Sequence, residues 1–290
     1  MKKNLTVNEF FDFALKKHQK NNLKIAEKLY KKILKINPNH VKSIFLLGTL
    51  SAQIKNFDRA RQLLSKVIQI HPNHVDACYN LGNVLKELGK YKEAADSYKK
   101  AIQINPNYVD AHNNLGIVLK ELRYYQKAIV CYEKAIQINP HNIGIYNNLG
   151  LAFKELGKFQ KAISCFQKVI KLKPDKIEAY KNLAIIFKRQ KKYKEAINTC
   201  LNSINKFGKN ASIYNILGSI YYELNNKENA KKYFNKSIDL EKGFTSIIAR
   251  KYLGILGVLP FPQQDTNEFL QSYYKDYKHK GWEDAGDSKY

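Results

Sequence analysis

Long apolar runs are missing from this sequence of 290 residues. The longest, around residues 252–261, is interrupted by Gly254, Gly257 and Pro260, and a membrane-spanning helix needs about 18 consecutive apolar residues. The first ten residues contain two lysines but no apolar stretch behind them, so we expect no secretory signal. The four cysteines form no CxxC pair, which is typical of a reducing compartment. These absences predict a cytoplasmic protein without a transmembrane segment.

Acidic residues and arginine are also scarce. The chain has 25 Asp plus Glu against 50 Lys plus Arg, a formal net charge of +25, and 45 of the basic residues are lysine. Such a charge raises nucleic acid or an anionic membrane as a partner. Recognition of phosphates and bases, however, favours the forked guanidinium of arginine. With 5 arginines, the basic surface is weaker evidence of such recognition, and composition alone leaves nucleic acid undecided.

A period of 34 residues runs through most of the chain, and three sets of residues follow it in one register. Prolines recur at Pro38, Pro72, Pro106, Pro140 and Pro174. Alanines recur at Ala26, Ala60, Ala94, Ala128, Ala162, Ala196 and Ala230. An apolar residue followed by a small one recurs at Phe13-Ala14, Leu47-Gly48, Leu81-Gly82, Leu115-Gly116, Leu149-Gly150, Leu183-Ala184 and Leu217-Gly218. A period of this length is the signature of stacked structural repeats, none of which can bury its apolar face alone.

The repeated unit resembles the tetratricopeptide repeat, a pair of antiparallel helices. In residues 75–108 the matching residues are Leu81, Gly82, Leu85, Ala94, Tyr98, Ala101 and Pro106, while Cys78 stands where the family usually has a larger apolar residue. The resemblance implies an all-α fold, a right-handed α-solenoid of seven helix-turn-helix repeats plus a C-terminal capping helix. First helices are expected to line its concave groove.

The expected organisation begins with an N-terminal tail at residues 1–6. Seven repeats follow at residues 7–40, 41–74, 75–108, 109–142, 143–176, 177–210 and 211–244. The last two lack the closing proline and have Gly208 and Lys242 in its place. Residues 245–290 are expected to hold a capping helix to about Gly257, a short helix after a capping box of Asp265 and Glu268, and a polar tail.

Small side chains at two positions of each repeat predict close helix packing. Counted from the first residue of a repeat, these are the eighth position, as in Gly82, and the twentieth, as in Ala94. We expect the two helices of a repeat to cross there, because a larger side chain would overpack the contact.

A ladder of asparagines is predicted on the groove side of the first helices. The sixth position of four consecutive repeats carries Asn80, Asn114, Asn148 and Asn182, and Asn113 and Asn147 precede two of them. The central repeats resemble the repeat arm of O-linked N-acetylglucosamine transferase, in which such a ladder holds the backbone of a substrate peptide. The resemblance implies the same role for these four residues. The alternative is that the asparagines were copied with the repeats and bind nothing.

A second ladder, of lysines, is predicted at the twelfth position. It consists of Lys86, Lys120, Lys154 and Lys188, and a glutamate follows each of the first three. Two interpretations stay open: a solvated edge that neutralises itself, or contacts with an acidic ligand. The predicted groove positions together carry a net charge near zero. The basic excess therefore belongs to second helices, loops and ends, which predicts a surface for solubility or weak electrostatic attraction and not a nucleic-acid channel.

No arrangement of residues predicts catalysis, a cofactor or a metal. The histidines His40, His71, His74 and His141 fall in the turns between repeats, where other repeats have Asn or Tyr. The cysteines occupy second-helix or packing positions, and no phosphate-binding glycine loop is present.

Two functions compete on this evidence. The preferred one is a non-enzymatic scaffold that binds an extended segment of a protein partner in the groove. Its alternative is the substrate-recognition arm of a glycosyltransferase-type enzyme whose catalytic domain is missing or encoded separately, because the 46 residues after the repeats cannot hold one.

Overall fold

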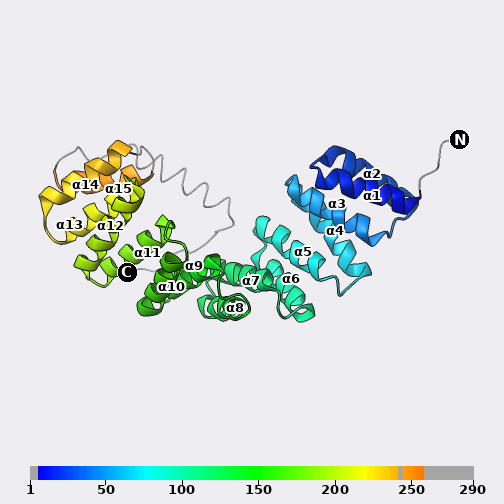
Figure 1. The fold of residues 1–290 in the computed structure, drawn as a ribbon, viewed down its shortest axis with the longest axis horizontal. Helices are drawn as coiled ribbons and strands as arrows, with labels where there is room; N and C mark the ends of the chain where they lie inside the picture. Colours follow the sequence, from blue (N-terminus) through cyan, green and yellow to red (C-terminus); the bar gives the residue numbers. More distant parts are fainter. Residues whose placement is uncertain (1–5, 241–243, 258–290) are drawn as a thin grey trace, which may run out of the picture. The chain divides into compact units, whose positions relative to one another are not determined.

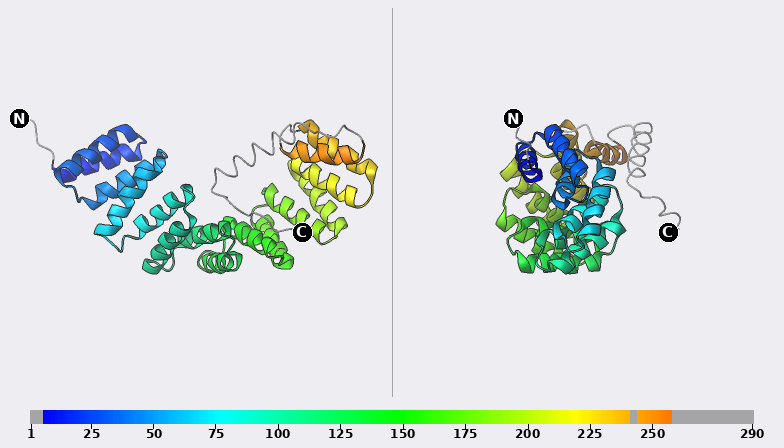
Figure 2. Two further views of the ribbon diagram at one scale, coloured as in Figure 1. Left: turned by 180° about the vertical axis from the view of Figure 1, so that it is seen from behind. Right: turned by 90° about the vertical axis from the view of Figure 1, so that its right-hand side faces the viewer.

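The computed structural model describes residues 6–240 and 244–257, which form helices and no strand (Figures 1 and 2). The first helices of the repeats are α1 (Val7–Gln19), α3 (Val41–Gln53), α5 (Val75–Glu87), α7 (Val109–Glu121), α9 (Ile143–Glu155), α11 (Ile177–Arg189) and α13 (Ala211–Glu223). The second helices are α2 (Leu23–Ile36), α4 (Phe57–Ile70), α6 (Tyr91–Ile104), α8 (Tyr125–Ile138), α10 (Phe159–Leu172), α12 (Tyr193–Phe207) and α14 (Lys227–Leu240), and α15 (Phe244–Ile255) follows them. The predicted all-α helical-repeat fold is confirmed.

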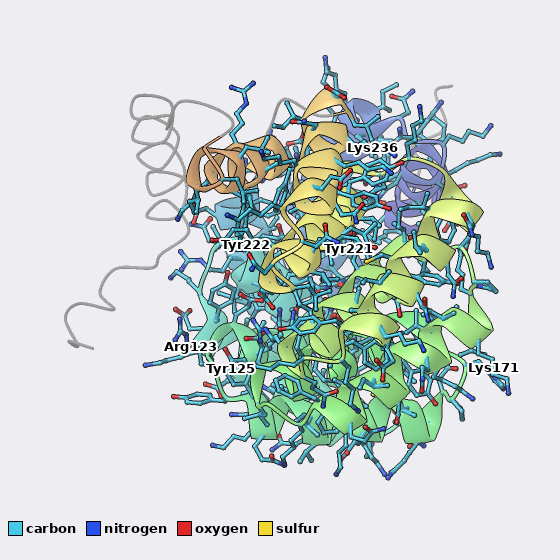
Figure 3. All side chains as sticks on the ribbon, turned by 90° about the vertical axis from the view of Figure 1, so that its left-hand side faces the viewer. Arg123, Tyr125, Lys171, Tyr221, Tyr222 and Lys236 are labelled. Atoms are coloured by element: carbon cyan, nitrogen blue, oxygen red, sulfur yellow. The ribbon has the colours of Figure 1, made fainter. Side chains whose placement is uncertain are left out.

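The chain divides into two compact units, Met1–Pro140 and His141–Tyr290. We call them the N-terminal unit, with α1–α8, and the C-terminal unit, with α9–α15. Within each unit, the second helix of a repeat packs against its own first helix and against the first helix of the next repeat. Long lysine side chains on the second helices are exposed, as for Lys171 and Lys236 of the C-terminal unit (Figure 3).

The capping helix packs on the last repeat, as the sequence predicts. Helix α15 contacts α14 and α13, and its Ala249 and Leu253 join Ala230 and Phe234 in one buried cluster. A terminal repeat needs such a cover because its outer apolar face has no further repeat to pack against. The predicted capping box at Asp265 and the short helix after it lie outside the described residues.

One backbone feature recurs in the turn between the two helices of each repeat. The fifteenth position adopts a positive φ in all seven, at Asn21, Lys55, Gly89, Arg123, Gly157, Lys191 and Asn225. Second helices that are followed two residues later by proline end at the thirtieth position. The residue before a proline is driven out of the helical region, as in Asn37 with φ −129° and ψ 91°. Helix α12 has no such proline and continues to Phe207, one position further, before Gly208 ends it.

The close helix crossings predicted from small residues are confirmed. The alanine at the twentieth position is 0% exposed in all seven repeats. At the eighth position, a Cβ added to Gly116 would lie 2.5 Å from Cε1 of Tyr132, and one added to Gly82 would lie 2.6 Å from Cε1 of Tyr98. The glycine therefore leaves room for the aromatic ring of the second helix. In repeat six the eighth position is the larger Ala184, and the second helix has the smaller Cys200 in place of an aromatic ring; both lie in one buried cluster.

Candidate functional site

The four asparagines of the predicted ladder are all half-buried on first helices. Asn80 and Asn114 lie on α5 and α7 of the N-terminal unit, and Asn148 and Asn182 lie on α9 and α11 of the C-terminal unit. Their contacts differ from repeat to repeat, so the equal spacing in the sequence does not give them equal roles.

Asn114 belongs to a hydrogen-bond network between three helices. Its Nδ2 donates to Oδ1 of Asn83 at 2.9 Å and to the hydroxyl of Tyr79 at 3.2 Å. The hydroxyl of Tyr98 donates to the same Oδ1 of Asn83 at 2.8 Å, and Nδ2 of Asn113 donates to Oδ1 of Asn114 at 3.2 Å. Burial raises the pKa of Tyr98, so this hydroxyl stays protonated and remains a donor. The network ties α7 to α5 and α6.

Asn83 is the functional candidate that the predicted ladder omits. It lies at the ninth position of α5, three residues after Asn80, and thus nearly one helical turn along the same face. Its Oδ1 is used by Tyr98 and Asn114. Because an amide also carries two N–H donors, Nδ2 of Asn83 can still donate to a ligand. The signal in the sequence was a second asparagine one turn from the ladder.

Asn80 and Asn83 line a cavity of about 270 Å³ in the N-terminal unit, which we call the first-helix cavity. Its remaining lining residues are Thr49, Ala52, Phe57, Val84 and Glu87. Ala52, Phe57 and Val84 are apolar, whereas the two asparagines, Thr49 and Glu87 are polar. A site of this composition suits an apolar side chain whose neighbouring peptide groups hydrogen-bond to the amides.

In the C-terminal unit, the side-chain amide of Asn182 hydrogen-bonds to neighbouring groups of the protein. Its Nδ2 donates to the backbone carbonyl of Glu178 at 3.0 Å, and its Oδ1 accepts from Nζ of Lys154 at 3.5 Å. Asn147 and Asn148 are half-buried neighbours on α9. The structure thus links a member of the asparagine ladder to a member of the lysine ladder.

Each lysine of the second ladder is paired with a carboxylate. The N···O distances are 3.3 Å for Lys86–Glu87, 2.9 Å for Lys120–Glu121, 3.6 Å for Lys154–Glu155 and 3.0 Å for Lys188–Glu223. The first three pairs join sequence neighbours, and the fourth joins α11 to α13. Of the two open interpretations, these pairs favour the edge that neutralises itself.

Two of the four histidines in the repeat turns have a structural role that the sequence did not reveal. His40 and His74 are N-cap residues, and Nδ1 of each accepts the backbone N–H three residues later, from Ser43 at 3.3 Å and from Ala77 at 3.2 Å. Asn142 and Asn210 cap their helices in the same way. Within the described ranges no three His, Cys, Asp or Glu side chains form a metal-binding group. No helix among those residues is long and apolar enough to cross a membrane.

Family models match several stretches of the chain. The model "TPR repeat" matches residues 82–122 and 124–157, and models of the tetratricopeptide repeat match 144–176 and 211–244. A model of the anaphase-promoting complex, cyclosome, subunit 3 matches residues 17–101. The comparison with curated proteins gave no match.

Solved structures show the same fold. The crystal structure of MamA is 32% identical over 57% of this chain and 96% of its own, with a TM-score of 0.54. YrrB, described as a TPR protein with an unusual peptide-binding site, is 20% identical over 64% of this chain and 95% of its own, with a TM-score of 0.53. A tetratricopeptide repeat protein from Parabacteroides merdae is 18% identical over 84% of this chain and 98% of its own, with a TM-score of 0.62. The repeat models, the identity to MamA over nearly all of its chain and the periodic helix pairs agree: this chain belongs to the tetratricopeptide repeat family.

Proposed function

We propose that this protein is a non-enzymatic interaction scaffold that binds an extended segment of a partner protein on its first helices. The observation that carries the proposal is the first-helix cavity, in which the amides of Asn80 and Asn83 border an apolar floor. Membership of the repeat family and the peptide-binding site described for YrrB support the same class of function.

The two asparagines suit a peptide backbone because an amide side chain both donates and accepts hydrogen bonds. Tyr98 and Asn114 hold Asn83 in one orientation before a ligand arrives. A side chain that is fixed in advance loses little entropy on binding, so more of its hydrogen-bond energy appears as affinity. In this proposal Asn80 and Asn83 contact the peptide directly, and Asn114 positions Asn83.

The other residues of the two predicted ladders have secondary roles in this proposal. Asn147 and Asn148 provide polar side chains on first helix α9 of the C-terminal unit, where Asn182 and Lys154 contact each other. Within each unit, the lysines of the second ladder are charged but locally neutralised by their ion pairs: Lys86 and Lys120 in the N-terminal unit, Lys154 and Lys188 in the C-terminal unit. The alternative function, a recognition arm of a glycosyltransferase-type enzyme, stays a prediction, as do the cytoplasmic location and the exclusion of nucleic acid.

A peptide selection with two matched variants tests the proposal. A random twelve-residue peptide library displayed on phage is selected on the full chain, and enriched peptides are synthesised for affinity measurements. Asn80→Ala should weaken binding about threefold to tenfold, since a hydrogen bond contributes about 0.5–1.5 kcal/mol net. The control Asn198→Ala changes an exposed asparagine on a second helix and should leave the affinity unchanged.

Equal affinities of the wild type and Asn80→Ala for every enriched peptide would refute the proposal. Asn80→Ala is a cleaner test than replacing all four ladder residues, because Asn114 also bonds α7 to α5. A change there would alter the fold as well as the binding surface.

A further inference from the structure

The second-helix side of repeats three and four departs from the polar pattern that the other repeats follow. At the sixteenth position six repeats have Asn or Lys, whereas repeat four has Tyr124, which is 49% exposed. At the twenty-second position six repeats have a polar residue, whereas repeat four has Val130, which is 59% exposed. Two large apolar side chains thus replace polar ones at exposed places.

A third departure lies on the facing helix. At the twenty-first position, repeat three has Ala95, which is smaller than the residue of every other repeat: Glu27, Arg61, Ile129, Ile163, Ile197 and Lys231. Helix α7 packs against both α6, which carries Ala95, and α8, which carries Val130. The shorter side chain leaves a space between the two second helices with α7 as its floor.

The three departures meet in one cavity of about 540 Å³, which we call the second-helix groove. Its apolar lining consists of Ala95, Leu115, Leu119, Leu122, Val130 and Cys131, together with the ring of Tyr124. The volume falls in the range of about 300–1,000 Å³ that is typical of ligand pockets. An apolar hollow with exposed apolar residues at its edge is characteristic of an interaction surface.

The charges at the edge of the groove indicate the chemistry of its occupant. Lys92, Lys99 and Lys127 lie there with one acid, Asp96. Asp96 pairs with Lys99 at 2.9 Å, and Nζ of Lys127 lies 5.4 Å from the centre of the Tyr124 ring. Lys92 and Lys127 pair with no carboxylate among the described residues. A second copy of this chain, at +25, would bring further positive charge.

We propose that the second-helix groove docks an acidic segment of a partner protein, with two or three leucine-sized side chains of that segment inserted between α6 and α8. This site goes beyond the proposed function, because it lies between the second helices α6 and α8, with α7 as its floor, and shares no residue with the first-helix cavity. A partner bound there leaves Asn80 and Asn83 accessible to a peptide.

Two substitutions that copy neighbouring repeats test the proposal. Ala95→Ile introduces the isoleucine that repeat four has at this position, Ile129. Val130→Ser introduces the serine that repeat five has at this position, Ser164. The control Gln62→Ser makes a matched change at the twenty-second position of repeat two. The random twelve-residue phage library is selected on the wild type and counter-selected on Ala95→Ile.

Peptides that the wild type retains and Ala95→Ile releases should combine two or three Leu, Ile or Phe residues with Asp or Glu. Their affinity should fall at least about tenfold in both groove variants and stay constant in Gln62→Ser and in Asn80→Ala. Circular dichroism checks that the variants fold. Should Ala95→Ile not fold, Val130→Ser, a change of an exposed side chain, supplies the same comparison.

Cys131 gives a second readout without any substitution. It lines the groove and is half-buried, whereas the other three cysteines are buried. Burial raises the pKa of the Cys131 thiol to about 11, so alkylation with iodoacetamide is followed at about pH 9, where some thiolate is present. A bound acidic peptide should slow this alkylation at least about fivefold.

Three results would overturn the proposal. The first is equal peptide affinity of the wild type and the groove variants, and the second is selection of basic peptides by the groove. The third is a concentration-dependent dimer of the wild type that Ala95→Ile abolishes, because the occupant would then be a second copy.

Discussion

At the sixth position of the first helices, the same amide side chain has different surroundings in successive repeats. Asn80 lines a cavity, Asn114 bonds to the side chains of two residues of α5, and Asn182 bonds to the backbone of its own helix. The sequence predicts the column because one residue type recurs every 34 residues. It could not predict the roles, because the partners Tyr79, Asn83 and Tyr98 stand at other repeat positions and meet Asn114 only through packing.

The network around Asn83 predicts an uneven effect of two neighbouring substitutions on stability. Asn83→Ala should lower the free energy of unfolding by about 1–3 kcal/mol, because the buried hydroxyl of Tyr98 loses its acceptor. Asn80→Ala should change it by less than about 0.5 kcal/mol. Urea unfolding measures both. Adding Tyr98→Phe to Asn83→Ala should recover part of the loss, and additive losses would show that the hydrogen bond is not the cause.

Two glycines at the same repeat position should respond differently to alanine. A Cβ at residue 116 would meet the ring of Tyr132 at 2.5 Å, whereas one at residue 48 would meet the side chain of Leu64 at 3.1 Å. Gly116→Ala should destabilise by about 1–3 kcal/mol through overpacking. For Gly48→Ala the gain of about 1 kcal/mol in helix propensity should offset the milder contact. Equal thermal unfolding temperatures for the two variants would contradict this account of the crossings.

At the scale of the helices, the period in the sequence predicts where each element lies, and the turn residues determine how it ends. The fifteenth position has a positive φ in every repeat, yet only Gly89 and Gly157 are glycines there. Lys55 adopts φ 61° despite its side chain, which costs about 1–2 kcal/mol relative to an ordinary backbone conformation. The sequence conceals this conformation because three different residue types besides glycine occupy the position.

Replacing Lys55 by glycine should therefore stabilise the turn. Lys55→Gly is expected to raise the free energy of unfolding by about 0.5–1 kcal/mol, the relief of strain exceeding the added freedom of the unfolded chain. The reciprocal change Gly89→Lys should lower it by a similar amount, because residue 89 has φ 73°. The comparison is made by urea unfolding, and a loss of stability in Lys55→Gly would show that the left-handed turn is not strained.

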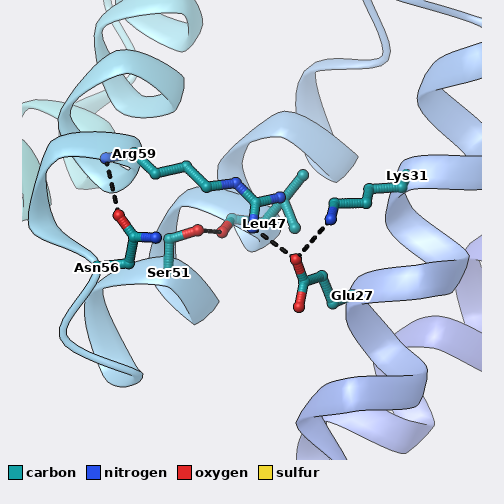
Figure 4. A network of polar contacts seen from close by, with 6 residues as sticks. All are labelled: Glu27, Lys31, Leu47, Ser51, Asn56 and Arg59. Carbon is teal, nitrogen blue, oxygen red and sulfur yellow. Dashed lines mark hydrogen bonds and ion pairs between the residues drawn. The ribbon is translucent and has the colours of Figure 1, made fainter.

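An ion-pair network between repeats one and two predicts a pH dependence (Figure 4). Glu27 contacts Lys31 at 2.8 Å and also Arg59 of α4, and these contacts, Lys31 first, lower its pKa from the usual 4.5. A carboxylate with a lowered pKa stabilises the fold above its unfolded pKa and loses this effect as the pH falls through the folded value. Glu27→Gln should cost at most about 1 kcal/mol at pH 7 and nothing at about pH 2. A difference that persists at pH 2 would assign the effect to packing instead.

At the scale of the whole molecule, the balance of lysines and acidic residues differs between the first helices and the second-helix groove. The lysines beside the first-helix side are paired with glutamates, whereas the edge of the second-helix groove has more lysines than acids. Sequence analysis predicts the near-neutral first-helix side from helical arcs. It does not predict the second-helix groove, because that feature arises between two helices. The signals were Tyr124 and Val130, which depart from polar columns, and Ala95, which is the smallest residue at its repeat position.

The two surfaces should therefore respond differently to salt. Raising NaCl from 50 to 500 mM should change the affinity of peptides bound in the first-helix cavity by less than about twofold. Acidic peptides in the second-helix groove should lose about fivefold or more, because salt screens their attraction to the lysines. Fluorescence anisotropy of labelled peptides measures both. A steep salt dependence for first-helix peptides would mean that their binding depends on charge rather than on the asparagine amides.

The central claim, that an extended peptide occupies the first-helix cavity, is tested most directly by locating the bound peptide. An enriched peptide whose binding is weakened by Asn80→Ala is resynthesised with benzoylphenylalanine at its apolar position, bound to the wild-type chain, irradiated and analysed by mass spectrometry. The account predicts cross-links to residues of the cavity on α3, α4 and α5, such as Thr49, Phe57 and Val84, and their loss when unlabelled peptide competes. Cross-links confined to second-helix residues outside this cavity would contradict it.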